Sequence, residues 1–194
     1  QPVLIENAPG SGDPPVPGAG LGVRRELGLH DTTPIVLYTG TFEAYQGLDL
    51  LLGAAGRVAT ADPQVRFVLA GGHPDQIART RARARALGVE AVTIFAGERP
   101  AEDIPTFLDA ADVLVSPRST GTNTPLKIYQ YLRAGKPIVA TRLLTHTQVL
   151  TDEVSILTDA TPDAFGDGIL RALRDPAGAA RLGRRARELA ETKY

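Results

Sequence analysis

Short apolar runs alternate along the chain with longer segments in which apolar residues recur at every third or fourth position. Because strands and helices would then follow one another in turn, the pattern predicts parallel strands joined by crossover helices. We therefore expect an α/β fold with a Rossmann-like, doubly wound parallel sheet. The six expected strands are Ile35–Thr39, Val65–Ala70, Ala91–Ala96, Asp112–Ser116, Pro137–Thr141 and Ser155–Thr158.

The expected helices each carry one apolar face. After the first strand this face comprises Leu48, Leu51, Leu52, Ala55 and Ala59, with the spacing of a helix that packs against a sheet. Near the chain end the face comprises Leu182, Ala186 and Leu189. Arginines fill the other positions there, and we interpret them as a solvated face: Arg181, Arg184, Arg185 and Arg187.

Residues 1–34 have a different composition from the rest. Five prolines and six glycines lie between positions 7 and 34, and both residue types interrupt regular structure. We interpret residues 1–34 as a linker or irregular arm and residues 35–194 as one domain.

Composition excludes several classes of protein. The 21 basic and 22 acidic residues balance, so no global charge draws the chain to nucleic acid. Without cysteine there are no disulfides or thiolate ligands, and three scattered histidines do not form a metal site unaided. No apolar run is long enough to span a bilayer. We expect a cytoplasmic protein without a bound metal.

The loop after the fourth expected strand is the strongest candidate site. Ligands of such sheets bind at the carboxyl ends of the strands. A polar loop there ends in Thr124 and Pro125, which predict a helix beginning at Pro125. Free amides from Leu126 onward would favour an anion such as phosphate. The loop residues are Gly121, Thr122, Asn123 and Thr124.

Charge is segregated around this helix start. Between Val113 and Thr151 there is no acidic residue, and the five basic ones are Arg118, Lys127, Arg133, Lys136 and Arg142. Such a stretch in a nearly neutral chain predicts a local positive pocket. We expect Arg118 and Lys127 to be the cations that act on a bound anion.

Glycine turns after the other strands complete the rim of this expected site. Gly40 and Thr41 follow the first strand, Gly71 follows the second and Gly97 the third. Glycine lets a ligand or another chain approach the backbone closely.

Together these segments resemble the carboxy-terminal domain of family 4 glycosyltransferases, retaining enzymes built from two Rossmann-like domains, the GT-B fold. The resemblance rests on YTGTFEAYQGLDLLL from Tyr38, FVLAGG from Phe67 and PLKIYQYLRAGKPIVAT from Pro125. It implies a nucleotide-sugar donor site in which the first loop contacts the diphosphate and the third-strand loop lies near the base. The implied donor-binding residues include Gln46, Gly47, Glu98, Arg99, Leu126 and Gln130.

The chain departs from the family pattern at four positions. An Arg and a Lys of the first loop are replaced by Thr41 and Gln46, and two glutamates by Thr122 and Gln130. We hypothesise that Arg118 or Lys127 replaces the lost positive charge. Gln130 would still hydrogen-bond a ribose, without the charge-assisted bond of about 1.5 to 3 kcal/mol.

The resemblance implies a hexosyltransferase that moves a sugar from a nucleoside diphosphate donor with retention, without a metal or other cofactor. The partners would be the nucleotide sugar and the protein's own amino-terminal acceptor domain, which we expect to be absent here. The isolated domain would then bind and not transfer. Contact with a membrane surface would come only through the missing domain.

Two alternatives stay open: a degenerate nucleotide-binding or scaffold domain, and half of a non-hydrolysing sugar-nucleotide epimerase. A nicotinamide-dependent dehydrogenase would need G-x-G-x-x-G where this chain has Gly40-Thr41-Phe42-Glu43. A serine hydrolase is disfavoured because no serine has a G-x-S-x-G setting, and we expect His146 to cap or pack locally.

Overall fold

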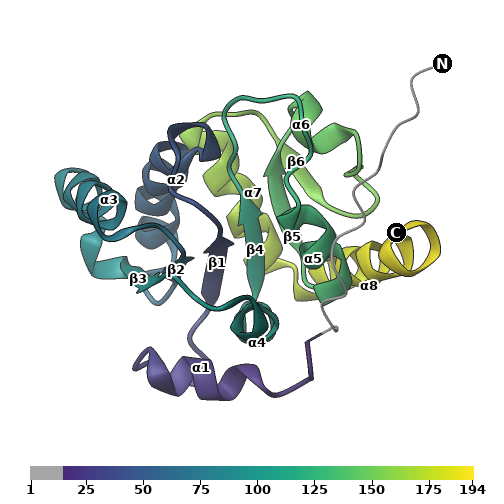
Figure 1. Cartoon of the computed structure of the whole chain (residues 1–194), viewed down its shortest axis with the longest axis horizontal. Helices are drawn as coiled ribbons and strands as arrows, with labels where there is room; N and C mark the ends of the chain where they lie inside the picture. The colour runs from purple at the N-terminus through teal and green to yellow at the C-terminus, as the bar shows by residue number, and fades with distance from the viewer. Residues whose placement is uncertain (1–14) are drawn as a thin grey trace.

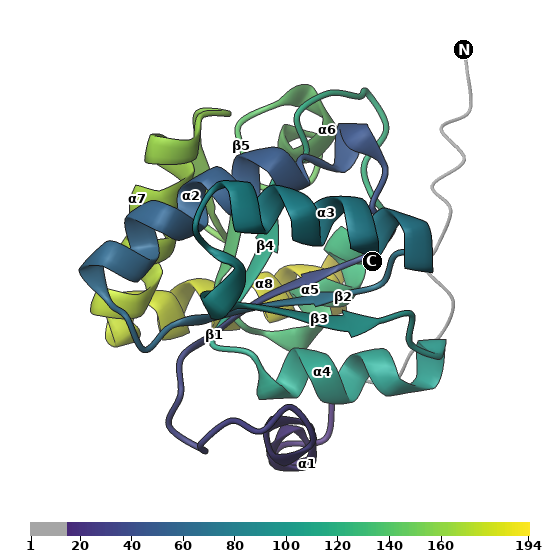
Figure 2. The ribbon, with the colours of Figure 1, turned by 90° about the vertical axis from the view of Figure 1, so that its left-hand side faces the viewer.

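A computed structural model describes residues 15–194 of the chain. Its centre is a six-stranded parallel sheet with helices on both faces. Figure 2 shows the layers, with α2 and α3 above the sheet and α4 and α1 beneath it. The expected Rossmann-like α/β fold is confirmed.

The strands are β1 (Ile35–Thr39), β2 (Arg66–Ala70), β3 (Thr93–Gly97), β4 (Val113–Ser116), β5 (Ile138–Thr141) and β6 (Ile156–Thr158). The α-helices are α1 (Gly20–Glu26), α2 (Leu48–Ala61), α3 (Pro74–Ala86), α4 (Ile104–Ala110), α5 (Lys127–Ala134), α6 (Leu144–Thr147), α7 (Pro162–Arg174) and α8 (Pro176–Lys193). Short 3-10 turns are η1 (Ala44–Gln46), η2 (Glu90–Val92) and η3 (Ala101–Asp103).

The strand order is β3-β2-β1-β4-β5-β6. The chain builds the sheet outward from β1 in one direction and then restarts at β4 on its other side. Parallel strands end at one edge of the sheet, and the helices that follow β1 and β4 pack on opposite faces of it. The place between the loops after β1 and β4, here called the crevice, is the usual ligand site of such sheets. Figure 1 shows this edge near the top, with α6, and α1 at the bottom.

The two faces of the sheet carry alternate residues of each strand. On one face Val36 and Tyr38 of β1 pack in a core with α2, α3 and α7. On the other, Ile35 and Leu37 pack with α1, α4, α5 and α8. Since both faces are covered, the strands are apolar throughout, which is why they were predicted from short apolar runs.

The predicted strands agree with the observed ones to within one residue at most ends. The prediction of a strand from Ala91 is wrong at its start, because residues 90–92 form the turn η2 and β3 begins at Thr93. The backbone N–H of Val92 donates to the carbonyl of Val89 there, which closes the turn.

The expectation of an irregular arm at residues 1–34 is wrong for Gly20–Glu26, which form α1. Residues 1–14 lie outside the described part of the chain. A Cβ added at Gly20 would lie 2.3 Å from the backbone nitrogen of Ala110, so this glycine permits close helix packing and does not break the helix. The Gly20 N–H also donates to the Asp109 carboxylate at 2.8 Å.

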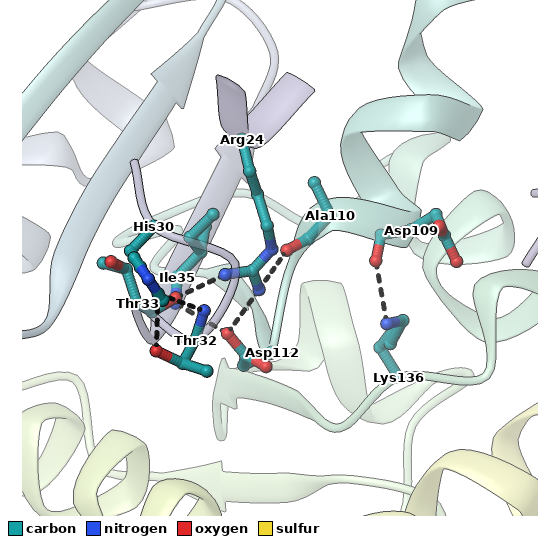
Figure 3. A network of polar contacts seen from close by, with 9 residues as sticks. All are labelled: Arg24, His30, Thr32, Thr33, Ile35, Asp109, Ala110, Asp112 and Lys136. Atoms are coloured by element: carbon teal, nitrogen blue, oxygen red, sulfur yellow. Dashed lines mark hydrogen bonds and ion pairs between the residues drawn. The ribbon is translucent and has the colours of Figure 1, made fainter. Parts of the chain in front are cut away.

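Arg24 fixes α1 to the sheet. Its buried guanidinium donates to the carbonyls of Thr33 and Ala110 and pairs with Asp112 at 2.9 Å (Figure 3). Asp112 also accepts the N–H of Ile35, the first residue of β1. These contacts make residues 20–34 part of the domain, so tertiary contacts override a composition that favours loops.

Candidate functional site

The walls of the crevice are the loops after β1 and β4, and they contact one another directly. The Ser119 N–H donates to the Tyr45 carbonyl at 3.1 Å. Gly47 has a φ of 76°, and a Cβ there would lie 1.9 Å from the carbonyl oxygen of Pro117. The glycine is therefore required both by its backbone conformation and by the approach of the neighbouring loop.

Backbone forms the floor of the crevice on the side of β2 and β3. The Gly40 N–H donates to the Ala70 carbonyl at 3.0 Å, and the Gly71 N–H to the Gly97 carbonyl at 2.7 Å. A Cβ on Gly71 would lie 1.9 Å from the Gly40 carbonyl oxygen. The three predicted glycine turns thus lie side by side.

Lys127, the first residue of α5, reaches across to the β1 loop. Its Nζ donates to the Thr39 carbonyl at 3.1 Å and to Gln46 Oε1 at 3.3 Å, and lies 4.0 Å from the ring centroid of Tyr38. Burial, helped by the charge of Arg118, lowers the pKa of this ammonium to about 7. The partners named are neutral, so when Lys127 is protonated its charge is not offset by them and can attract an anion.

Two tyrosines hold the end of β1, where Thr39 accepts a hydrogen bond from Lys127. The Tyr131 hydroxyl, fully buried, bonds the N–H and Oγ1 of Thr39 at 3.0 and 3.1 Å. The Tyr38 hydroxyl donates to the Thr41 carbonyl at 2.5 Å. Burial raises the pKa of Tyr131 to about 12 and also raises that of Tyr38, so both hydroxyls stay protonated. These bonds fix the end of β1.

Arg118 is bound to its own loop. Its Nη1 donates to the Asn123 carbonyl and, at 2.9 Å, to Thr145 Oγ1, while its guanidinium carbon lies 4.9 Å from the ring centroid of Tyr45. Its Nε is buried and has no acceptor within residues 15–194. The two predicted cations therefore differ, since Arg118 orders the loop while Lys127 lies between the loops.

Helix α6 and the residue after it hold the polar loop from behind. Thr145 Oγ1 donates to the Asn123 carbonyl at 2.7 Å, and Gln148 Nε2 donates to the Thr122 carbonyl. Thr141 Oγ1 donates to the Arg118 carbonyl at 2.6 Å. Three carbonyl groups of the loop are thereby held by the end of β5 and by the α6 segment.

His146 packs locally, as predicted. It is fully buried, and its ring nitrogens lie 2.8 Å from Ser116 Oγ and 2.8 Å from the Thr141 carbonyl. Burial lowers its pKa to about 4, the Thr141 hydrogen bond opposing this and the charges of Lys127 and Arg118 adding to it. A neutral ring then donates to Thr141 and accepts from Ser116. Because neither side chain reaches solvent, the pair is not a hydrolase nucleophile and base.

The prediction that α5 begins at Pro125 is wrong by two residues. Leu126 is the N-cap and Lys127 the first helical residue, and no side chain caps this end. The Ile128 N–H already bonds the Pro125 carbonyl in a tight first turn. The N–H groups of Leu126 and Lys127 have no acceptor among the described residues, and Leu126 is 60% exposed. The expected free amides are therefore those of Leu126 and Lys127.

A hollow of about 210 Å³ lies over the ends of β1, β2 and β3, and its lining includes Gly40, Thr41, Gly71, Glu98 and Arg99. His73 and Gln76, which lie at the start of α3 after β2, also line it. Arg99 is held from outside the hollow: its Nη1 pairs with Glu26 of α1 at 2.7 Å and its Nε donates to the Ala96 carbonyl. A residue predicted to bind the donor is thus tied to α1.

The other predicted site residues lie on the surface of the same edge. Gln130 of α5 and the loop residues Gly121, Thr122 and Asn123 are exposed, and Thr124 and Pro125 are partly buried. The side chain of Gln130 makes no hydrogen bond with a described residue. Within residues 15–194 no group of three or more acidic or histidine side chains could hold a metal ion.

Sequence reasoning missed the residues that support the site: Tyr38, Tyr45, Tyr131, Thr145 and Gln148. Buried tyrosines and threonines follow the same spacing as core residues, so the pattern gave no signal for them. Helix α6 is only four residues long, too short for periodicity to be recognised.

The family described as Glycosyl transferases group 1 matches residues 23–189. A D-inositol 3-phosphate glycosyltransferase from Acidothermus cellulolyticus is 31% identical over 179 residues, 88% of this chain and 40% of that protein. The chain thus spans about two-fifths of the length of this relative.

Solved structures agree on the fold. Anabaena HepE, crystallised with UDP and glucose, superposes with a TM-score of 0.81 at 22% identity over 92% of this chain and 49% of its own. The carboxy-terminal domain of a group 1 glycosyl transferase from Francisella tularensis has a TM-score of 0.78 at 16% identity, with 93% of this chain and 95% of its own covered. The described chain therefore has the architecture of one such domain.

Proposed function

Because this chain belongs to the glycosyl transferases group 1 family, we propose that it binds the nucleoside diphosphate sugar from which the intact enzyme transfers a hexose with retention of configuration. The partial coverage of its relatives implies a second, amino-terminal domain, which would supply the acceptor site. The chain alone would bind the donor without transferring the sugar.

The observation that carries this proposal is the position of Lys127 beside two free amides. Its Nζ lies between the β1 and β4 loops, and the N–H groups of Leu126 and Lys127 begin α5 without acceptors among the described residues. A helix amino terminus and an ammonium group together favour a multiply charged anion. A diphosphate in the crevice would meet both.

These groups match the demand of the reaction. When the bond between sugar and diphosphate lengthens, negative charge grows on the leaving phosphate. Donors that are fixed before the reaction stabilise that charge more in the transition state than in the ground state. We therefore propose that the protein alone stabilises the leaving group and that no metal ion or other cofactor takes part.

Lys127 is the better candidate to replace the positive charge that the family carries in the first loop. Its Nζ lies 3.3 Å from Oε1 of Gln46, one of the positions where that charge is missing. Arg118 would act mainly by ordering the polar loop, although its buried Nε could donate to a ligand. Gln130 and the hollow lined by Glu98 would contact ribose and base.

No helix within residues 15–194 is both long and apolar enough to cross a bilayer. We propose that the intact enzyme acts in the cytoplasm, in keeping with the absence of cysteine from the sequence. Any contact with a membrane surface in this reaction would be made by the acceptor domain.

Calorimetry with UDP, GDP and ADP tests donor binding by the chain itself. One of them should bind, and Lys127→Met should weaken its binding by at least about tenfold, since a charge-assisted hydrogen bond contributes about 1.5 to 3 kcal/mol. Lys193→Met, at the exposed end of α8, is the matched control. Binding of none of the three would leave a degenerate domain as the better description.

The intact enzyme tests the chemistry. Proton NMR of the first product should show the anomeric configuration of the donor, and activity should survive EDTA. An inverted product, or turnover lost with EDTA and restored by Mg²⁺, would contradict the proposal. Conversion of the donor to an epimer in which the sugar is still linked to the nucleotide, with no transfer to an acceptor, would instead favour the epimerase alternative.

A further inference from the structure

The arginines of α7 and α8 form a charged surface that the proposed donor site does not use. Between positions 168 and 187 there are six arginines and one acidic residue, Asp175. The carboxyl ends of the parallel strands lie at the crevice edge of the sheet. Helix α7 follows β6 and runs away from that edge, so its last turn lies at the opposite edge of the sheet. Figure 1 shows α8 at the lower right, away from α6.

These arginines differ from the others in their partners. Elsewhere in residues 15–194 every arginine except Arg25 makes an ion pair or a side-chain hydrogen bond. Five have neither with any residue of that described part and lie close together in the sequence: Arg171, Arg174, Arg181, Arg184 and Arg185. The charge of Arg171 does lower the pKa of Asp152, but that carboxylate is already paired with Arg142 at 2.7 Å.

Three of the five line one concave surface. A hollow of about 190 Å³ lies between the end of α7 and the start of α8, with Arg171, Arg181 and Arg185 at its sides. Ile156 and Leu182 are among the apolar residues that line it. These three arginines are exposed, and each forms part of the wall of this one space.

The acidic group of this hollow is already engaged. Asp175 Oδ1 accepts the Gly178 N–H at 2.9 Å and caps α8. Glu188, one turn beyond Arg184, makes no ion pair with a described residue. Three arginines thus line the hollow with one carboxylate among them, so positive charge is in excess there and the arginines repel one another.

We propose that this hollow is an anion site for a phosphate group, separate from the donor crevice. Guanidinium groups present paired N–H donors that match phosphate oxygens, and several such bonds hold the anion in one orientation. The volume suits a phosphate or a small phosphate ester. A free phosphate ester and the headgroup of a phospholipid share this chemistry, and the site does not depend on the proposed transfer reaction.

NMR on the ¹⁵N-labelled chain tests the site with inorganic phosphate as the probe, at constant pH and ionic strength. The amides of Gly178 and Ala179, which line the hollow, should shift saturably with phosphate and not with chloride. The double variant Arg181→Gln/Arg185→Gln should weaken this binding by about tenfold or more. Arg184→Gln, on the same helix but outside the hollow, is the matched control and should leave it unchanged.

The absence of a saturable shift would overturn the proposal, as would an equal response to chloride or a response that the double variant leaves intact. Because the readout is at α8, phosphate bound near Lys127 would not be mistaken for it. Vesicles then identify the source of the phosphate. Sedimentation with phosphatidylglycerol vesicles but not with phosphatidylcholine assigns a lipid headgroup, and saturation by phosphate without sedimentation assigns a free ester.

Discussion

Lys127 Nζ donates to Oε1 of Gln46 at 3.3 Å, which joins the first residue of α5 to the last residue of η1. The contact spans the crevice between the two loops. A lysine on one wall is thereby brought to a position on the other wall where the family pattern that the sequence resembles would have a positive charge. This contact is the basis for the proposal that Lys127 replaces that charge.

The lowered pKa of Lys127 predicts that a nucleoside diphosphate binds together with a proton. At about pH 8 a group with a pKa of about 7 is mostly neutral, and a nearby anion raises that pKa, so the lysine takes up a proton. At about pH 6 the lysine is already charged and the uptake should vanish. Calorimetry in two buffers of different ionisation enthalpy measures the protons taken up.

Lys127→Met should abolish this proton uptake. Lys193→Met should preserve it, since that lysine is exposed. Equal heats in both buffers at the higher pH would show that Lys127 does not change its protonation when the ligand binds.

Thr145→Val should disturb the polar loop while keeping the shape of the side chain. It removes the bonds to the Asn123 carbonyl and from Arg118, at a residue that is fully buried. Leaving such groups unsatisfied costs about 1 to 3 kcal/mol in free energy of unfolding. Urea unfolding should show this loss, and nucleotide affinity should fall as well.

Thr145→Ser keeps the hydroxyl and should restore most of the nucleotide affinity. If Thr145→Val lowers stability and leaves affinity unchanged, α6 supports the fold but does not position the loop for the ligand.

Glu26→Gln should alter nucleotide binding from a distance. The Glu26 carboxylate pairs with Arg99 Nη1 at 2.7 Å, and Arg99 lines the hollow over the ends of β1 to β3. Since half-exposed ion pairs contribute only about 0 to 1 kcal/mol, stability should change little. Affinity for a nucleoside diphosphate, or the preference among bases, should change about severalfold if the pair holds Arg99 in place.

Asp167→Asn is the matched control, because it breaks an ion pair of the same length whose carboxylate is similarly exposed, Arg57 with Asp167 at 2.7 Å, between α2 and α7. The same change in binding for both variants would count against a role for α1 in the site.

Gly47→Ala should destabilise the crevice more than its backbone conformation alone requires. The positive φ costs about 1 to 3 kcal/mol, and the new Cβ would also displace the Pro117 carbonyl, 1.9 Å away. Gly88→Ala has a similar φ of 71° with nothing within 4 Å, so it carries the conformational cost without the contact. The difference between the two, measured by urea unfolding, isolates the contact between the loops.

The sheet was predictable because β1, β4 and their neighbours are buried on both faces, which leaves uninterrupted apolar runs. The crevice followed from the strand alternation, and Gly40, Gly71 and Lys127 were predicted at its edge from glycine turns and charge segregation. Sequence pattern and composition reflect the local conformational preference of each residue, and the structure at these positions follows that preference.

The sequence predictions fail where contacts between residues far apart in the sequence determine the local structure. Gly20 favours a loop by composition, yet the closeness of Ala110 makes it the residue that lets α1 pack. The helix after the polar loop starts at Lys127 because Ile128 closes a tight turn on Pro125, a choice that the threonine and proline before it do not reveal. Thr145 and His146 act through partners on other elements, which sequence spacing does not show.

The floor of the crevice, built from Gly40, Gly71 and Gly97 bonded through their main chain, has a consequence for laboratory evolution. Point mutations change side chains, and a floor without them offers almost nothing to select on. New ligand preferences would have to arise from side chains around it, such as His73, Glu98 and Arg99 of the hollow or Gln46 and Lys127 between the loops, so a library should be built on those codons and leave the three glycines unchanged.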